Sequence, residues 1–174
     1  MLLFIACLPV STNAQTPTEN GASRASMVLS IVAGIINYTR WPHLGGSLRV
    51  CIAGESEHSN HLRGNASSIQ TTIGMPVSFQ AIQSPENVVA QCNALYVGQT
   101  QEAKRFLEHA TGQPILSIGE GKELCSMGSM FCLDLSAPGS EVRFAANLDA
   151  ISRSTVRVNP QVLRLTSRLS RKAP

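Results

Sequence analysis

The chain has 174 residues, of which 43% are hydrophobic and 14% charged, with a formal net charge of +3. This composition excludes a collagen-like or intrinsically disordered chain and is typical of a globular domain with a real core. The charge is unevenly placed: residues 1–149 carry eight Lys or Arg and eleven Asp or Glu, whereas residues 150–174 carry six Lys or Arg and no acid. A basic segment of this kind can bind an acidic partner or anionic lipid headgroups. The alternative is a solvated helix face followed by a frayed tail. Few aromatic residues accompany it, so nucleic-acid binding is not expected.

The first residues have the features of an export signal. Leu2–Val10 is an apolar run that is too short to span a bilayer, which needs about 20 residues. Thr12 and Ala14 are small residues before a cleavage position at Gln15, although no basic residue precedes the apolar run. We expect a secretory signal peptide over residues 1–14, a flexible lead-in over 15–22 and a single domain over 23–174, exported to the periplasm.

The first predicted element of the domain is a helix over Ala25–Tyr38. Its apolar stripe, at helical spacing, extends so far round the helix that we expect burial in a core or at a dimer interface. Pro42 follows the end of the helix, and the residue before a proline is pushed out of helical conformation. The stripe consists of Met27, Val28, Leu29, Ile31, Val32, Ile35 and Ile36.

The next hundred residues alternate short apolar runs with polar, helix-compatible stretches. This alternation predicts βαβ units and therefore an α/β fold, as one compact domain with a largely parallel sheet flanked by helices. The predicted strands are Leu48–Ala53, Pro76–Ile82, Ala94–Val97 and Pro114–Ile118, and the helices between them are Glu57–Ala66, Ser84–Ala90 and Gln101–Ala110.

The last part of the domain is predicted to be an antiparallel hairpin followed by two short helices. Two strand-like runs flank a Pro-Gly turn signal, which is typical of a hairpin at the edge of a sheet. Each helical stretch follows an Asn, which is a favoured N-cap. The hairpin strands are Phe131–Leu135 and Glu141–Ala145, and the helices are Leu148–Ser152 after Asn147 and a stretch that opens at Asn159-Pro160.

Motifs for catalysis or metal binding are weak. The sequence contains no dinucleotide-binding fingerprint, P-loop or nucleophile elbow. His58 and His61 lie three residues apart on a predicted helix, but no convincing third ligand accompanies them, so surface histidines are favoured over a metal site. Glutamates at 55, 57, 120 and 123 form an acid–base pair only if the fold brings them together. We therefore expect no enzyme, no catalytic residue, no metal and no cofactor.

Four cysteines follow the predicted signal peptide, namely Cys51, Cys92, Cys125 and Cys132. An even number in an exported chain favours disulfides over metal binding, with three possible pairings. Cys125 and Cys132 enclose a short loop that contains methionine, glycine and serine, so a bond between them is either a staple or an exposed, reducible switch. The spacing of this pair excludes a C-x-x-C redox catalyst.

Six blocks of the sequence resemble, in the same order, the YfiR family of periplasmic proteins. The blocks are YTRWP, LRVCIAGES, QCNALYVG, PILSIGE, CSMGSMFCLDL and VRFAANLDAISRSTVRVNPQVLRL. The resemblance implies a compact α/β domain, a homodimer, and disulfides that join Cys51 to Cys92 and Cys125 to Cys132, the second associated with redox control. It also implies a periplasmic repressor that contacts the periplasmic domain of an inner-membrane, YfiN-like diguanylate cyclase and is sequestered by an outer-membrane lipoprotein. Envelope or redox stress would relieve repression, and so control cyclic di-GMP and biofilm formation.

We expect the partner-binding surface near the hairpin and the C-terminal helix, with Phe144, Asn147, Asp149, Arg153 and Arg157 as candidates. Each also has a structural interpretation, because Phe144 fits a core position, Asn147 a helix cap and the arginines a solvated face. The alternative function is a periplasmic small-ligand-binding sensor. Its pocket would lie at the carboxyl ends of the parallel strands, near Gly54, Gly98 and Gly119.

Overall fold

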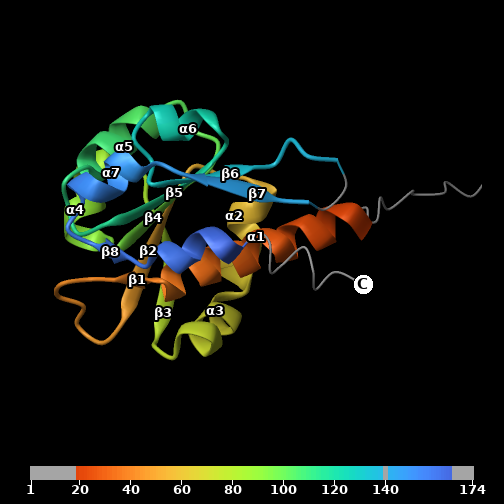
Figure 1. The fold of residues 1–174 in the computed structure, drawn as a ribbon, viewed down its shortest axis with the longest axis horizontal. Coiled ribbons are helices and arrows are strands. Elements are labelled where there is room, and N and C mark those ends of the chain that lie inside the picture. Colours follow the sequence, from red (N-terminus) through yellow and green to blue (C-terminus); the bar gives the residue numbers. More distant parts are fainter. Residues whose placement is uncertain (1–18, 139–140, 166–174) are drawn as a thin grey trace, which may run out of the picture.

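A six-stranded sheet with the order β3-β2-β4-β5-β6-β7 forms the centre of the molecule (Figure 1). The computed structural model describes residues 19–138 and 141–165, so the predicted signal peptide lies outside the described residues. Neighbouring strands are parallel except for β6 and β7, which are antiparallel. The strands are β2 (Leu48–Ala53), β3 (Val77–Ala81), β4 (Ala94–Val97), β5 (Leu116–Glu120), β6 (Phe131–Asp134) and β7 (Arg143–Ala146).

The predicted fold class is confirmed. The protein is one α/β domain with a mostly parallel sheet, and the predicted antiparallel hairpin is β6 with β7. Strands β2 and β4 have the predicted bounds. Every residue of β4 is buried, and so is every residue of β2 except Arg49, as is typical of central strands covered on both faces.

Helices cover both faces of the sheet and divide the core into two clusters. On one face, Ile31, Leu62 and Ile69 from three helices pack with alternate residues of the strands. On the other face, Val88, Phe106 and Leu124 pack with the remaining alternate residues and with both cysteine pairs. The first face carries α1 (Glu19–Asn37), α2 (Glu57–Gly64) and α3 (Ala66–Ile73), and the second carries the 3-10 helix η1 (Pro85–Asn87), α4 (Val88–Gln91), α5 (Ala103–Ala110) and α6 (Glu123–Ser126).

Helix α1 begins at Glu19, six residues before the predicted start at Ala25. Val28 and Ile35 are fully buried within this chain, so much of the predicted apolar stripe belongs to the protein's own core. Gly34 allows the close approach of Leu165, which follows η2 near the end of the domain. The Leu165 Cδ1 would lie 2.8 Å from a Cβ added to the glycine. No helix of the described part of the chain is both long and apolar enough to cross a membrane.

Two other elements differ from the predictions. The predicted helix Glu57–Ala66 ends at Gly64, and a second helix, α3, follows it at once. The predicted helix Ser84–Ala90 is a 3-10 turn followed by α4, and the Ser84 side chain bonds to the Glu86 carboxylate instead of capping the backbone.

A two-stranded antiparallel ribbon, absent from the predictions, joins the start of the domain to its end. It pairs β1 (Thr39–Arg40) with β8 (Arg157–Val158), so that Arg40 lies opposite Arg157. The remaining elements are α7 (Leu148–Arg153), which follows the hairpin, and the 3-10 helix η2 (Pro160–Arg164), which ends the described chain beside α1 (Figure 1).

Candidate functional site

The five predicted partner-binding residues lie on β7, α7 and β8. Phe144 of β7 is half-buried, and its ring packs edge-on against Phe131 with 5.9 Å between the ring centroids. Asn147 caps α7, because its side-chain oxygen accepts a hydrogen bond from the Ala150 amide at 3.0 Å. Both residues therefore have structural contacts, whereas the other three candidates, Asp149, Arg153 and Arg157, are exposed.

Helix α7 lies on the surface with no fully buried residue, and its Ala150 and Ile151 are partly buried against the core. Asp149 and Arg153 form an ion pair one turn apart on its exposed side. Leu148, the first residue of the helix, is 68% exposed. In η2, Leu163 is 52% exposed. We call the exposed side chains of α7, β8 and η2 the C-terminal surface.

A hollow of about 420 Å³ lies beside the β1–β8 ribbon. Arg157 lies in its lining together with Arg40, to which it is paired across the ribbon. A second hollow of about 410 Å³ also contains Arg40 and has an apolar wall formed by Trp41, Leu44 and Met75. The C-terminal surface therefore borders the first of these hollows, and Arg40 lies in the lining of both. Neither Arg40 nor Arg157 has a carboxylate partner among the ion pairs of the described residues.

Both cysteine pairs are bonded, on the face of the sheet that carries α4, α5 and α6. Cys51 of β2 joins Cys92, just before β4, and both are buried. Cys125, at the end of α6, joins Cys132 of β6, and only Cys125 is partly exposed. This is the pairing that the family resemblance implies.

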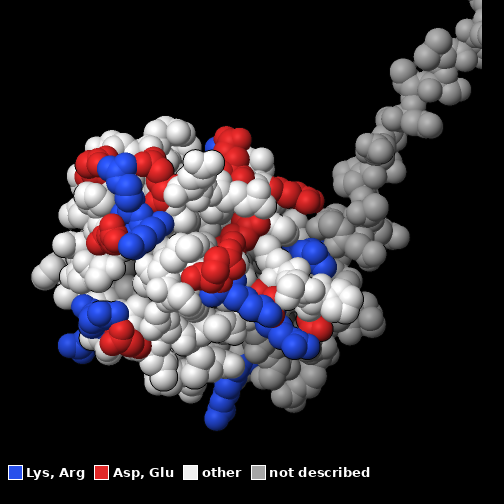
Figure 2. All heavy atoms as spheres, turned by 90° about the horizontal axis from the view of Figure 1, so that it is seen from above, with Lys and Arg blue, Asp and Glu red and all other residues white. Residues whose placement is uncertain are grey.

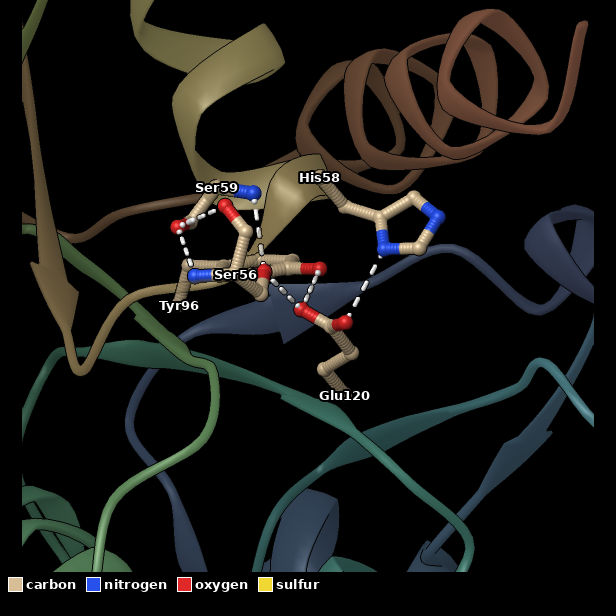
Figure 3. A network of polar contacts seen from close by, with 5 residues as sticks. All are labelled: Ser56, His58, Ser59, Tyr96 and Glu120. Atoms are coloured by element: carbon tan, nitrogen blue, oxygen red, sulfur yellow. Dashed lines mark hydrogen bonds and ion pairs between the residues drawn. The ribbon is translucent and has the colours of Figure 1, made fainter. Parts of the chain in front are cut away.

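A buried carboxylate, Glu120, occupies the carboxyl edge of the sheet where the strand order reverses between β2 and β4 (Figure 3). It accepts hydrogen bonds from the Ser56 hydroxyl at 2.5 Å and the Tyr96 phenol at 3.0 Å, and its other oxygen lies 2.9 Å from Nδ1 of His58. Ser56 also caps α2, because its hydroxyl accepts a hydrogen bond from the Ser59 amide. Glu120 thus lies at the positive end of α2, the position that an anionic ligand takes in many sheets of this kind.

The environment sets the charge state of this network. Burial raises the pKa of the Glu120 carboxyl, but the hydrogen bonds from His58, Ser56 and Tyr96 outweigh burial, so the pKa lies below its ordinary value. Burial, together with the adjacent carboxylate, raises the pKa of the Tyr96 phenol well above its ordinary value. Glu120 is therefore ionised and Tyr96 is a neutral donor at neutral pH.

The ligand pocket predicted near Gly54, Gly98 and Gly119 is instead a close-packed region. A Cβ added to Gly54 would lie 2.4 Å from the carbonyl oxygen of Gln99, and one added to Gly119 would lie 2.6 Å from the Leu124 side chain. The Glu120 carboxylate lies over Gly98, 3.7 Å from where a Cβ would stand. The hollows described above lie elsewhere, around Arg40.

The remaining predicted candidates do not come together as a metal or acid–base site. His58 contacts Glu120, whereas Glu55 lies beside Arg63 and Glu57 is exposed in the first turn of α2. Within the described ranges, no three His, Cys, Asp or Glu side chains are close enough to hold a metal ion.

The face seen in Figure 2 carries acidic and basic side chains interspersed with one another. Ion pairs of the described chain include Arg105 with Glu86 at 2.7 Å and Lys122 with Asp134 at 3.0 Å. Pairs of this kind on exposed surfaces leave little net field to attract a charged partner.

Replacing Glu120 by glutamine is expected to destabilise the protein at neutral pH and to flatten its loss of stability in acid. The wild-type carboxylate contributes stability above its ordinary pKa of 4.5, and this contribution is lost as the pH falls through the lower folded-state pKa. Glutamine does not titrate and turns donor hydrogens toward the Ser56 and Tyr96 hydroxyls, so we expect a loss of about 1–3 kcal/mol at pH 7. Urea denaturation at pH 7 and at pH 3 measures both effects. Glu123→Gln, an exposed change three residues away, should leave stability at pH 7 unchanged, and an equal effect of the two changes would contradict the expectation.

The fold and these sites define a class of protein. It is an α/β domain in which the protein's own Glu120 occupies the edge of the sheet where the strand order reverses. It has two disulfides on one face of the sheet and exposed leucines and arginines on the C-terminal surface. Residues 25–167 match the family model described as YfiR/HmsC-like, and the chain belongs to this family. The predicted membership of the YfiR family is thereby confirmed. At the level of the family, it supports a periplasmic regulator in cyclic di-GMP signalling, and a regulatory rather than catalytic role.

The sequence indicated Glu120 and His58 as candidates, but their contact was not predicted, and Ser56 and Tyr96 were not named. The sequence does contain a signal for this network. Glu120 comes at the end of one buried strand, and Ser56 comes between another buried strand and a helix. Arg157, which lines the first hollow, was a predicted partner-binding residue, but the hollows themselves were not predicted, because β1 and β8 are only two residues long.

Proposed function

We propose that this protein represses an inner-membrane diguanylate cyclase by binding the cyclase's periplasmic domain, and so controls cyclic di-GMP and biofilm formation. The observation that carries the proposal is the family match over residues 25–167. The exposed leucines of the C-terminal surface and its exposed Arg157 support it, since aliphatic and Arg side chains suit a protein–protein interface. We extend the proposal, on the family resemblance, to a homodimer in the periplasm, relief of repression by envelope or redox stress, and sequestration by an outer-membrane lipoprotein.

The proposal places the cyclase on the C-terminal surface, where Asp149, Arg153 and Arg157 are the charged contacts. Phe144 and Asn147 would support this surface without contacting the cyclase, because Phe144 packs on Phe131 and Asn147 caps α7. The apolar contacts would be Leu148 and Leu163.

Leu148→Asp is expected to weaken binding of the cyclase's periplasmic domain at least tenfold, which corresponds to about 1.4 kcal/mol. The change replaces an apolar contact by a charge, and aspartate is well tolerated in the first turn of a helix, so α7 should persist. Calorimetry on the purified pair measures the affinity, and cellular cyclic di-GMP should rise in the variant strain.

The matched control is Val89→Asp, because Val89 of α4 is 50% exposed and lies outside the C-terminal surface. It should bind the cyclase domain as the wild type does. Equal losses in the two variants would remove the C-terminal surface from the proposal, and an absence of binding by the wild type would remove the proposed function itself.

A small-ligand sensor is the second candidate. The 410 Å³ hollow favours it, with apolar walls and the Arg40 guanidinium, although it lies away from the predicted pocket. Thermal stabilisation by a small apolar anion in the absence of the cyclase domain would support this function.

A further inference from the structure

We propose that the free edge of β3 is the surface through which two copies of this chain pair. The two β3 strands would run antiparallel about a two-fold axis at Phe79, and the two sheets would become continuous. The homodimer belongs to the proposed function, on which the pairing rests.

Strand β3 lies at one edge of the sheet, so its backbone is bonded to a neighbouring strand on one side only (Figure 1). The Leu48 amide of β2 donates to the Pro76 carbonyl at 2.8 Å, and the Ile82 amide donates to the Ile52 carbonyl of β2 at 2.9 Å. The two strands are parallel, and in a parallel pair every second residue of a strand bonds to its neighbour. The even-numbered residues of β3 therefore face β2, and the odd-numbered residues face away from the sheet.

The odd-numbered residues of β3 are Val77, Phe79 and Ala81. None of the backbone hydrogen bonds within the described ranges reaches the amides or carbonyls of these three residues. A row of free donors and acceptors along a sheet edge is a template for another strand.

The spacing of the three residues makes this edge complementary to itself. In an antiparallel pairing centred on Phe79, Phe79 lies opposite Phe79 of the second copy, and Val77 lies opposite Ala81. Each of these pairs exchanges two backbone hydrogen bonds, because both of its members turn their backbone groups outward. A two-fold axis, the commonest symmetry of homo-oligomers, requires that identical strands pair antiparallel. A second copy therefore bonds every outward group of β3.

The side chains of β3 also suit a second copy. Val77 and Phe79 are half-buried against the core cluster to which α1 contributes. Residues that lie opposite one another in an antiparallel pair share a face of the sheet, so the apolar face would continue from one copy into the other. Ala81 and, on the other face, Ser78 are exposed and small, so they leave room for a neighbouring strand.

The two edges of the sheet differ in charge. Proteins usually protect an edge strand from pairing with charged side chains. The β7 edge is protected in this way, because Arg143 lies on β7 and pairs with Glu141 at 2.7 Å. Residues 64–85, which include β3, contain no Asp, Glu, Lys or Arg. The β3 edge therefore has no charge to repel an identical strand, and an uncharged partner matches it.

A pairing of two five-residue strands forms a small interface. Stable protein complexes usually bury about 1,200–2,000 Å² in total, which is more than two short strands supply. We therefore expect the dimer to dissociate reversibly on dilution, so that both states can be observed in one preparation.

Amide hydrogen exchange, followed by NMR on the purified mature chain, tests the pairing without any substitution. In dilute solution, the amides of Ser78 and Gln80 should exchange slowly because they are bonded to β2, and those of Val77, Phe79 and Ala81 should exchange freely. Concentrating the protein should slow exchange at the three odd-numbered amides at least tenfold. Pairing through any other surface would not protect alternate residues of β3.

Ala81→Pro removes one outward amide and leaves the bonds to β2 in place, since proline is tolerated on an edge strand where its nitrogen faces solvent. It should raise the Kd of the dimer at least tenfold, as measured by analytical ultracentrifugation. Ala81→Lys is the second variant, because it keeps the backbone amide and adds a charge at an exposed position. It should also raise the Kd at least tenfold.

Ala146→Pro is the matched control on the opposite edge of the sheet. The Asn147 amide donates to the Met130 carbonyl at 2.8 Å, so the amide of the preceding residue faces away from β6. This variant should leave the Kd of the dimer unchanged.

A dimer that persists in both Ala81 variants would overturn the pairing, and so would a wild type that stays monomeric when concentrated. Protection of the odd-numbered amides that appears only when the cyclase's periplasmic domain is added would also overturn it, because the edge would then belong to that partner.

Binding of the cyclase's periplasmic domain, measured on the same variants, separates the pairing from the proposed function. If the β3 edge forms the dimer and the wild type binds no cyclase domain, the pairing stands and the proposed repression fails. If the wild type binds the domain and the dimer persists in both Ala81 variants, the pairing fails and the proposed repression stands.

Discussion

Replacement of Cys51 and Cys92 together by alanine is expected to lower the free energy of unfolding by about 4 kcal/mol. The bond joins residues 41 positions apart, so it removes much of the entropy of the unfolded chain. Cys51 and Cys92 are 0% and 3% exposed, and alanine adds no polar group to this part of the core. Urea denaturation under oxidising conditions measures the difference, together with an increase in the m-value as the unfolded chain expands.

The second disulfide is the control for this effect. Cys125 and Cys132 are separated by only 7 positions, and the same entropic argument gives about 2 kcal/mol for Cys125→Ala with Cys132→Ala. A loss from the short loop that equals or exceeds the loss from the long one would mean that contacts in the folded state, rather than chain entropy, determine what each bond contributes.

Phe131→Ala is expected to lower the free energy of unfolding by about 3–5 kcal/mol. Phe131 is fully buried in the middle of the core, on β6 between β5 and β7. Its removal leaves a cavity that the surrounding strands cannot close, because their positions are fixed by hydrogen bonds on both sides. Thermal and urea denaturation measure the loss, and Phe131→Leu, which fills most of the volume, should cost about 1 kcal/mol.

Phe144→Ala distinguishes the structural from the partner-binding interpretation of Phe144. Its ring is half-buried against Phe131, so we expect a smaller loss of stability, about 1–2 kcal/mol. The double variant should lose less than the sum of the single variants, because the two rings share one contact. Strict additivity would contradict the edge-on packing.

The sequence predicted those parts of the fold whose signal is local. Ala94–Val97 and all of Leu48–Ala53 except Arg49 are buried, and Asn147 is followed by a helix that its side chain caps. Helix α3, at Ala66–Ile73, was missed because ASSIQTTI contains few apolar residues and only Ile69 among its described side chains is buried. Its place depends on packing against α1 and β3, which no local pattern reveals.

The sites depend on order in the sheet, which the sequence does not specify. Glu120 and Ser56 meet because β2, β4 and β5 are neighbours, although the elements between them could be arranged in several ways. Arg40 meets Arg157 because two residues of β1 pair with two of β8, too short a pairing to leave a hydrophobic pattern. The cysteine pairing, in contrast, could be inferred from family resemblance alone.

The β1–β8 ribbon has a consequence for the order in which the protein can assemble. Strands β2, β3 and β4, with the Cys51–Cys92 bond, lie in the first part of the chain and have their partners early in synthesis or translocation. Residues 39 and 40 can pair only after residues 157 and 158 have been synthesised and delivered, more than a hundred positions later in the chain. The C-terminal surface can therefore form only after residues 157 and 158 have been translocated. A partly translocated chain would not yet have this surface for a partner to bind.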